Sequence, residues 1–167
     1  MNRVSIALCL SVSISMAACR MADGPMPNPK ADEVPNQLGD LGRDLSAVVS
    51  GDTQARQDFM DDLMVFVDLQ KSPGAEAPVK ALGAQVIDAA VATKPSEAAA
   101  APLLEHLYVA ISARELSEGQ VKTLEENVQA AASRIGLDDV KARALAAQAV
   151  IVQQAVTERH RRWYEVF

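Results

Sequence analysis

Apolar residues recur every three or four positions from Leu38 onward, which is the spacing of amphipathic α-helices. Short breaks rich in Gly, Pro and Ser interrupt this pattern, and these residue types favour turns. Amphipathic helices joined by short connections are typical of antiparallel bundles. The pattern therefore predicts an all-α fold, an antiparallel bundle of five or six amphipathic helices over residues 38–49, 53–70, 78–92, 102–115, 118–135 and 139–167.

Several of the expected helix ends carry recognisable signals. Ser117 and Gln120 have the spacing of a capping box, in which the two side chains satisfy free backbone N–H groups at a helix start. Gly136 suits the left-handed position that ends a helix. The alanine-rich residues 97–101 before Pro102 can form either a first helical turn or a kink. The inward side of the last helix is expected to carry Val140, Ala144, Ala147, Ile151 and Ala155, and Trp163 and Phe167 can continue it.

The N-terminal segment follows a different pattern. Arg3 precedes an apolar run from Val4 to Ala18, as in a secretory signal, and the run is shorter than the roughly 20 residues that span a bilayer. The tetrapeptide Met16-Ala17-Ala18-Cys19 resembles the lipobox of bacterial lipoproteins. The resemblance implies cleavage before Cys19 and attachment of lipid to Cys19. The alternative is a plain signal peptide cleaved at a nearby small-x-small pattern.

A proline-rich segment separates this signal from the helical pattern. Proline disfavours helix interiors and favours extended geometry, so the segment is expected to act as a tether. The chain then divides into a signal peptide at 1–18, a lipidated Cys19 with a tether at 19–37, and a helical domain at 38–167. In enteric lipoproteins, Asp after the lipidated Cys marks retention in the inner membrane. Arg20 therefore indicates anchoring in the outer membrane, facing the periplasm.

Composition supports the helical prediction and limits the classes of partner. Alanine is the commonest residue type and aromatic residues make up 4% of the chain, which disfavours β-sandwiches and barrels. The formal charge of −6 argues against a nucleic-acid binder.

Few residues suggest catalysis or metal binding. Sequence motifs for phosphate, dinucleotide or zinc binding and for a nucleophile elbow are absent. His106 could serve as a lone base or ligand, but a histidine at the edge of the core is the simpler interpretation. Asp58 and Asp62 lie one helical turn apart and could hold a cation, but a solvated acidic side of the helix is the better interpretation. We expect no enzyme activity, no cofactor and no metal.

The C-terminus concentrates basic and aromatic residues. Basic side chains interact favourably with a helix C-terminus, which gives the cluster a structural explanation. Arg beside Trp and Tyr could also contact lipid headgroups, an anionic wall polymer or a protein. The candidate interaction patch consists of Arg159, Arg161, Arg162, Trp163 and Tyr164.

A second, shorter resemblance concerns the segment Leu116-Ser117-Glu118-Gly119-Gln120. It is similar to the Leu-Thr-x-x-Gln motif of Spy/CpxP-type periplasmic proteins, with Ser in place of Thr and one copy where that family usually has two. This resemblance implies a small, all-helical, exported dimer that acts as a chaperone or envelope-stress regulator.

The sequence therefore predicts a lipid-anchored envelope protein whose helical bundle is a binding or structural module. Its expected contacts are the membrane, through lipid on Cys19, and an envelope protein or the cell wall. A homodimer is possible, and nucleic acid is not expected. The alternatives are a Spy/CpxP-like chaperone or regulator and, as the weakest, a metal-dependent sensor or enzyme.

Overall fold

The computed structural model describes residues 34–70, 72, 74–113 and 115–164, with side chains from Asn36 to Thr157. This part of the chain forms six helices and contains no strand, which confirms the predicted all-α bundle. The helices are α1 Val34–Val49, α2 Gln54–Val65, α3 Glu76–Thr93, α4 Glu97–Ser112, α5 Glu118–Arg134 and α6 Asp139–Tyr164.

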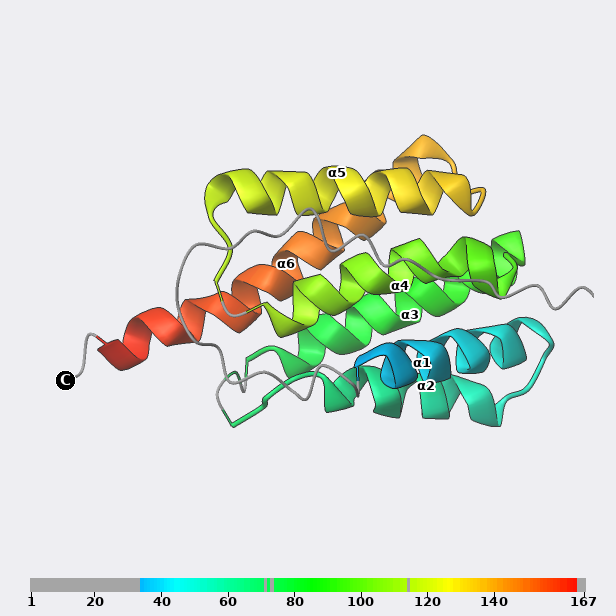
Figure 1. Ribbon diagram of the computed structural model, residues 1–167, viewed down its shortest axis with the longest axis horizontal. Helices are drawn as coiled ribbons and strands as arrows, with labels where there is room; N and C mark the ends of the chain where they lie inside the picture. Colours follow the sequence, from blue (N-terminus) through cyan, green and yellow to red (C-terminus); the bar gives the residue numbers. More distant parts are fainter. Residues whose placement is uncertain (1–33, 71, 73, 114, 165–167) are drawn as a thin grey trace, which may run out of the picture.

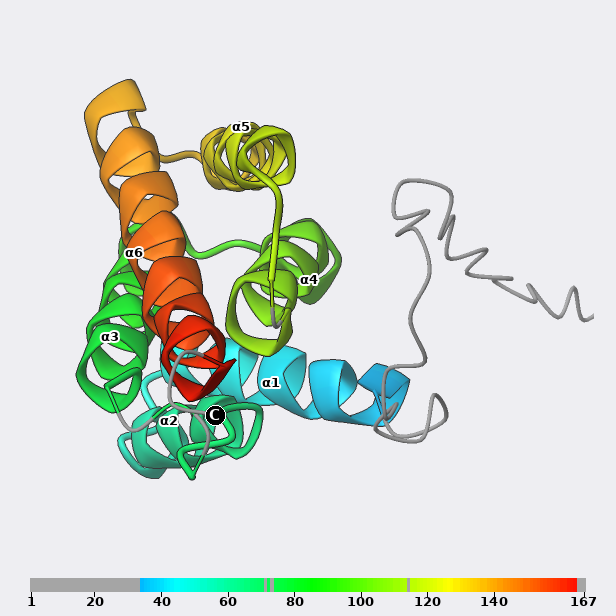
Figure 2. The same ribbon diagram turned by 90° about the vertical axis from the view of Figure 1, so that its left-hand side faces the viewer.

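Helices α3 and α4 form the middle of the bundle. The α1–α2 hairpin packs on one side of them, and α5 with α6 packs on the other (Figure 1). Helix α1 contacts α2, α3 and α4, whereas α6 contacts α3, α4 and α5. Figure 2 shows that α6 runs between α3 and the α4–α5 pair, so α6 closes this side of the core.

The core consists almost entirely of aliphatic and alanine side chains. Most apolar residues of the first five helices are buried or partly buried. Phe66 follows the end of α2 and packs edge-on against Tyr108 of α4, with ring centroids 5.0 Å apart. The largest fully buried side chains are Phe59, Leu41, Leu63, Leu82, Leu103, Leu107, Ile111, Leu145, Gln153, Val79, Val86 and Val128.

The predicted inward side of α6 is wrong at Val140, Ala144, Ala147 and Ile151, whereas Ala155 is partly buried against the core. Val140 is 73% exposed and Ile151 is 48% exposed, and Ala144 and Ala147 between them also face solvent. The helix instead buries a neighbouring side that consists of Ala142, Leu145, Ala146, Ala149, Val152, Gln153 and Val156. Both sides have helical spacing and apolar residues, so the periodicity of α6 alone does not distinguish them.

The buried side of α6 includes a glutamine. Gln153 is 1% exposed, and its Nε2 donates a hydrogen bond of 2.7 Å to the carbonyl of Ala113 at the end of α4. Its Oε1 accepts a hydrogen bond of 3.0 Å from the Thr157 hydroxyl. Both polar ends of the side chain are therefore satisfied, which removes the cost of burying them. The hydrogen bond between Gln153 and the Ala113 carbonyl fixes the position of α6 relative to the end of α4.

The helix ends follow the predicted local signals in two places. Ser117 and Gln120 form the capping box at the start of α5. Gly136 has a φ of 99° after α5, and the N–H of Leu137 donates to the carbonyl of Ala132, as in a Schellman motif. These hydrogen bonds satisfy backbone groups that the helix cannot pair internally.

Other helix boundaries differ from the prediction. Helix α4 begins at Glu97, with Pro102 inside it, because the Ser96 side chain accepts a hydrogen bond from the N–H of Ala99. The residues before Pro102 thus form helical turns. Helix α1 begins at Val34, four residues before Leu38, with Pro35 in its first turn, where a missing N–H costs nothing.

Candidate protein-binding face

Helices α3 and α6 share an outer surface that is poor in charge. Their exposed residues repeat at three- and four-residue steps, and the two helices lie against each other along this side. Between the ends of this side, most residues are Ala, Val or Ile, with Gln85, Asp88 and Lys141 among them, and the other exposed residues of the two helices include the charged Glu76, Lys80, Asp139 and Arg143. We call this surface the α3–α6 face, and it comprises Ala77, Ala81, Ala84, Gln85, Asp88, Ala92, Val140, Lys141, Ala144, Ala147 and Ile151.

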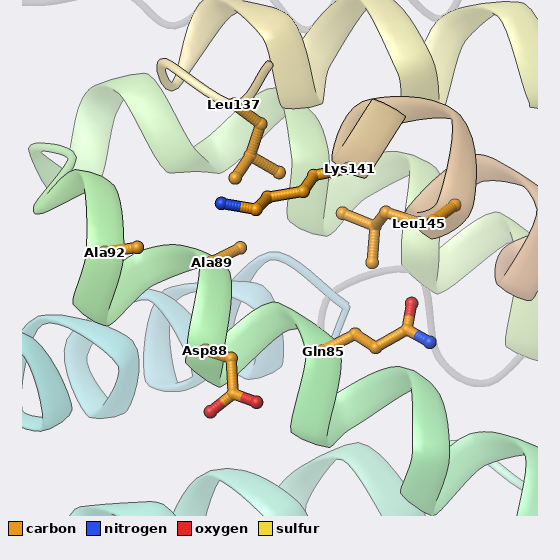
Figure 3. A pocket seen from close by; sticks show the side chains of 8 residues that line it. Gln85, Asp88, Ala89, Ala92, Leu137, Lys141 and Leu145 are labelled. Carbon is orange, nitrogen blue, oxygen red and sulfur yellow. The ribbon is translucent and has the colours of Figure 1, made fainter. Parts of the chain in front are cut away.

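A groove of about 280 Å³ lies within this face, between α3 and the start of α6. Ala89, Ala144 and Leu145 form much of its apolar lining, and Leu137 closes it on the side of the α5–α6 turn. Figure 3 shows the Lys141 side chain extended across the groove towards α3, with its stem beside Leu137. The stem adds apolar surface to the groove while the ammonium group remains accessible.

The two helices are joined at the other end of the face. Gln148 of α6 donates a hydrogen bond of 3.1 Å from Nε2 to the carbonyl of Pro78 in α3. The face is therefore a continuous surface over two fixed helices. A rigid surface loses little entropy on binding, which favours association.

Other outer surfaces of the bundle are highly charged. The exposed side of α2 carries Arg56, Asp58 and Asp61, and that of α5 carries Glu118, Lys122, Glu125, Glu126 and Arg134. An exposed helix normally presents such residues to water. The α3–α6 face departs from this rule, and contiguous exposed apolar surface marks interaction sites.

The α6 part of this face is visible in the sequence as apolar residues at helical spacing. Val140, Ala144, Ala147 and Ile151 have helical spacing, and the prediction assigned them to the core. The structure places them on the α3–α6 face. The α3 residues of the face could not be assigned to it from the sequence, because the sequence does not show that α3 lies beside α6.

The predicted C-terminal patch lies on the last turns of α6. Figure 1 shows these turns extending past the ends of the neighbouring helices. The side chains of Arg159, Arg161, Arg162, Trp163 and Tyr164 lie outside the described part of the structure. Cys19, the predicted lipidation site, also lies outside the described residues.

Acidic residues of α1 and α2 come close together. Burial raises the pKa of Asp44, and the nearby carboxylates of Asp62 and Asp58 act in the same direction. Within the described residues, no group of three or more His, Cys, Asp or Glu has the arrangement of a metal site.

His106 lies partly buried on α4. Burial lowers the pKa of its imidazole, the carboxylate of Glu105 opposes this shift, and the guanidinium of Arg134 on α5 adds to it. The neutral ring is thus favoured at the boundary between α4 and α5. This environment agrees with a histidine at the edge of the core.

Comparisons with known proteins give no relative from which a function could be transferred. No protein-family model, curated protein or solved structure matches the chain. Among the described helices, none combines the length and the apolar character needed to cross a membrane.

Proposed function

We propose that this protein is a lipid-anchored envelope protein whose helical bundle binds another protein through the α3–α6 face. The observation that carries the proposal is the exposed apolar surface formed by α3 and α6. Contiguous apolar surface on a monomer commonly marks an interaction site.

Anchoring is supported by the sequence that precedes the bundle. The lipobox-like Met16-Ala17-Ala18-Cys19 supports lipid attachment at Cys19, and the prolines that follow support a tether. Two or three acyl chains hold a protein stably at a membrane. Arg20 supports an outer-membrane location facing the periplasm, where the bundle reaches envelope proteins or the cell wall. The basic and aromatic residues Arg159–Tyr164 are a second candidate contact in this setting.

A Spy/CpxP-like chaperone or stress regulator is the second candidate function. The same apolar face favours it, because a chaperone needs exposed apolar surface to hold unfolded clients. A chaperone would bind many unrelated chains weakly, whereas a specific module would bind one partner. Suppression of the aggregation of several unrelated proteins would therefore favour the chaperone.

Lipidation can be tested separately from binding. Globomycin, or the substitution Cys19→Ala, should leave an unprocessed precursor in the producing cell. Normal maturation to a soluble protein under either condition would contradict the anchoring.

Binding through the face can be tested in intact cells with a photo-reactive amino acid. The full chain carrying it at Ala81, on the α3–α6 face, should give a discrete cross-linked species of higher mass. The matched control places it at Ala130, an exposed alanine on α5. Equal cross-linking at both positions, or none at Ala81, would contradict a binding role for the face.

A further inference from the structure

We propose that the partner of the α3–α6 face is a second copy of this chain, packed face to face across a two-fold axis. This inference rests on the proposed function, because it assumes that the face binds protein. The contact would be a layer of four helices, α3 and α6 from each copy.

The dimensions of the face fit a stable dimer. Helix α3 has 18 residues, which corresponds to a length of about 27 Å. Two adjacent helices with axes 8–10 Å apart give a width of about 20 Å. Such a footprint covers roughly 540 Å² per copy, and the two copies together clear the ~1,000 Å² that a specific interface needs.

The distribution of charge also favours self-association at this place. The chain carries a formal charge of −6, so two copies repel each other over most orientations. The exposed charges of α3 and of α6 up to Ile151 sum to zero, because Glu76, Asp88 and Asp139 balance Lys80, Lys141 and Arg143. Two copies can therefore meet here without net repulsion, whereas the acidic side of α2, with Asp58 and Asp61, would oppose contact.

The order of side-chain sizes along α6 is self-complementary. The exposed positions Val140, Ala144, Ala147 and Ile151 are spaced by four, three and four residues, which is a heptad spacing. Their order of large, small, small and large reads the same from either end. In an antiparallel pair, Val140 of one copy lies beside Ile151 of the other, and the central alanines allow the two helices to approach closely.

Dimerisation would also explain why α6 is apolar on more than one side. The core covers the side with Leu145, Ala149 and Val152, and solvent covers the side with Val140 and Ile151. The side of a helix that faces solvent is normally polar, so an exposed apolar side calls for a partner. In the proposed dimer, the second copy covers the exposed side.

The experiment uses two differently tagged full-length copies produced in the same cell, with the photo-reactive residue at Ala81 of one copy. The expected product carries both tags, and Ala147→Glu should reduce its yield at least tenfold. The matched substitution Ala130→Glu on α5 should leave the yield unchanged, and equal melting temperatures of the two variants would show that both remain folded.

The identity of the cross-linked product separates the two proposals. A product that contains a different protein and only one tag would overturn the dimer but leave the binding role of the face intact. No product at Ala81 would overturn both. A two-tag product that persists with Ala147→Glu would place the contact elsewhere on the molecule and would overturn this inference.

Discussion

The packing of α2 on α3 depends on the absence of a side chain at Gly83. A Cβ atom added at Gly83 would lie 2.5 Å from the Met60 sulfur and 2.9 Å from Cδ2 of Leu63. Met60 is flexible and partly buried, so it can move. Leu63 is 1% exposed and is held by the core on all sides. The substitution Gly83→Ala must therefore shift a core side chain or separate α2 from α3.

Two effects of opposite sign decide the outcome of Gly83→Ala. Replacing Gly by Ala in a helix interior contributes up to about 1 kcal/mol of stability. Overpacking a tightly packed core costs about 1–3 kcal/mol. Because contacts below 3 Å involve a buried leucine, overpacking should dominate, with a net loss of about 1–2 kcal/mol in the free energy of unfolding.

The matched control is Gly39→Ala in α1. An added Cβ at Gly39 meets no atom within 4 Å, so only the helix-propensity gain of about 0.5–1 kcal/mol applies. Urea unfolding of the full chain in mild detergent should show a lower midpoint for Gly83→Ala and a higher one for Gly39→Ala, with equal slopes. If Gly83→Ala stabilised the protein as much as Gly39→Ala does, the close approach of α2 and α3 would be refuted.

Three further predictions concern single side chains. Ser117→Ala removes the capping box that Ser117 forms with Gln120 and should cost about 1 kcal/mol in urea unfolding; an unchanged midpoint would show that the cap contributes nothing. Lys94 ends α3 with a φ of 49°, so Lys94→Gly should relieve strain and stabilise the fold by about 0.5–1 kcal/mol, and a lower melting temperature would contradict this. Burial and the Asp62 carboxylate raise the pKa of Asp44 above 3.8, so its charged form destabilises the fold at neutral pH. Asp44→Asn should raise the melting temperature at pH 7, and this gain should shrink as the pH falls through the raised pKa; a gain that grew in acid would contradict the assignment.

Much of the fold could be predicted because local signals in this sequence are clear. Helices α1 to α3 and α5 follow from apolar spacing between turn-forming residues. The capping box at Ser117 and the left-handed Gly136 fix the limits of α5. The start of α4 could not be predicted, because a proline can either begin a helix or lie inside one. Here Ser96 caps the helix upstream, and Pro102 removes only one hydrogen bond within it.

The candidate site could not be predicted because it depends on tertiary packing. Alanine is compatible with both core and surface, so the alanines of α6 gave no reliable direction. The buried Gln153 would be expected on the surface, but the carbonyl of Ala113, 40 residues away in the sequence, provides its partner. The α3–α6 face exists only because the fold places α3 beside α6.

Dimerisation through the α3–α6 face can be tested on the purified chain. Sedimentation equilibrium of the full chain in a mild, density-matched detergent measures its mass in solution most directly. A dimer through the α3–α6 face should give twice the mass of one chain. The substitution Ala84→Glu should give the mass of a single chain while the helical content is retained. A single-chain mass for the unsubstituted protein at tens of micromolar, or a dimer unaffected by Ala84→Glu, would contradict it.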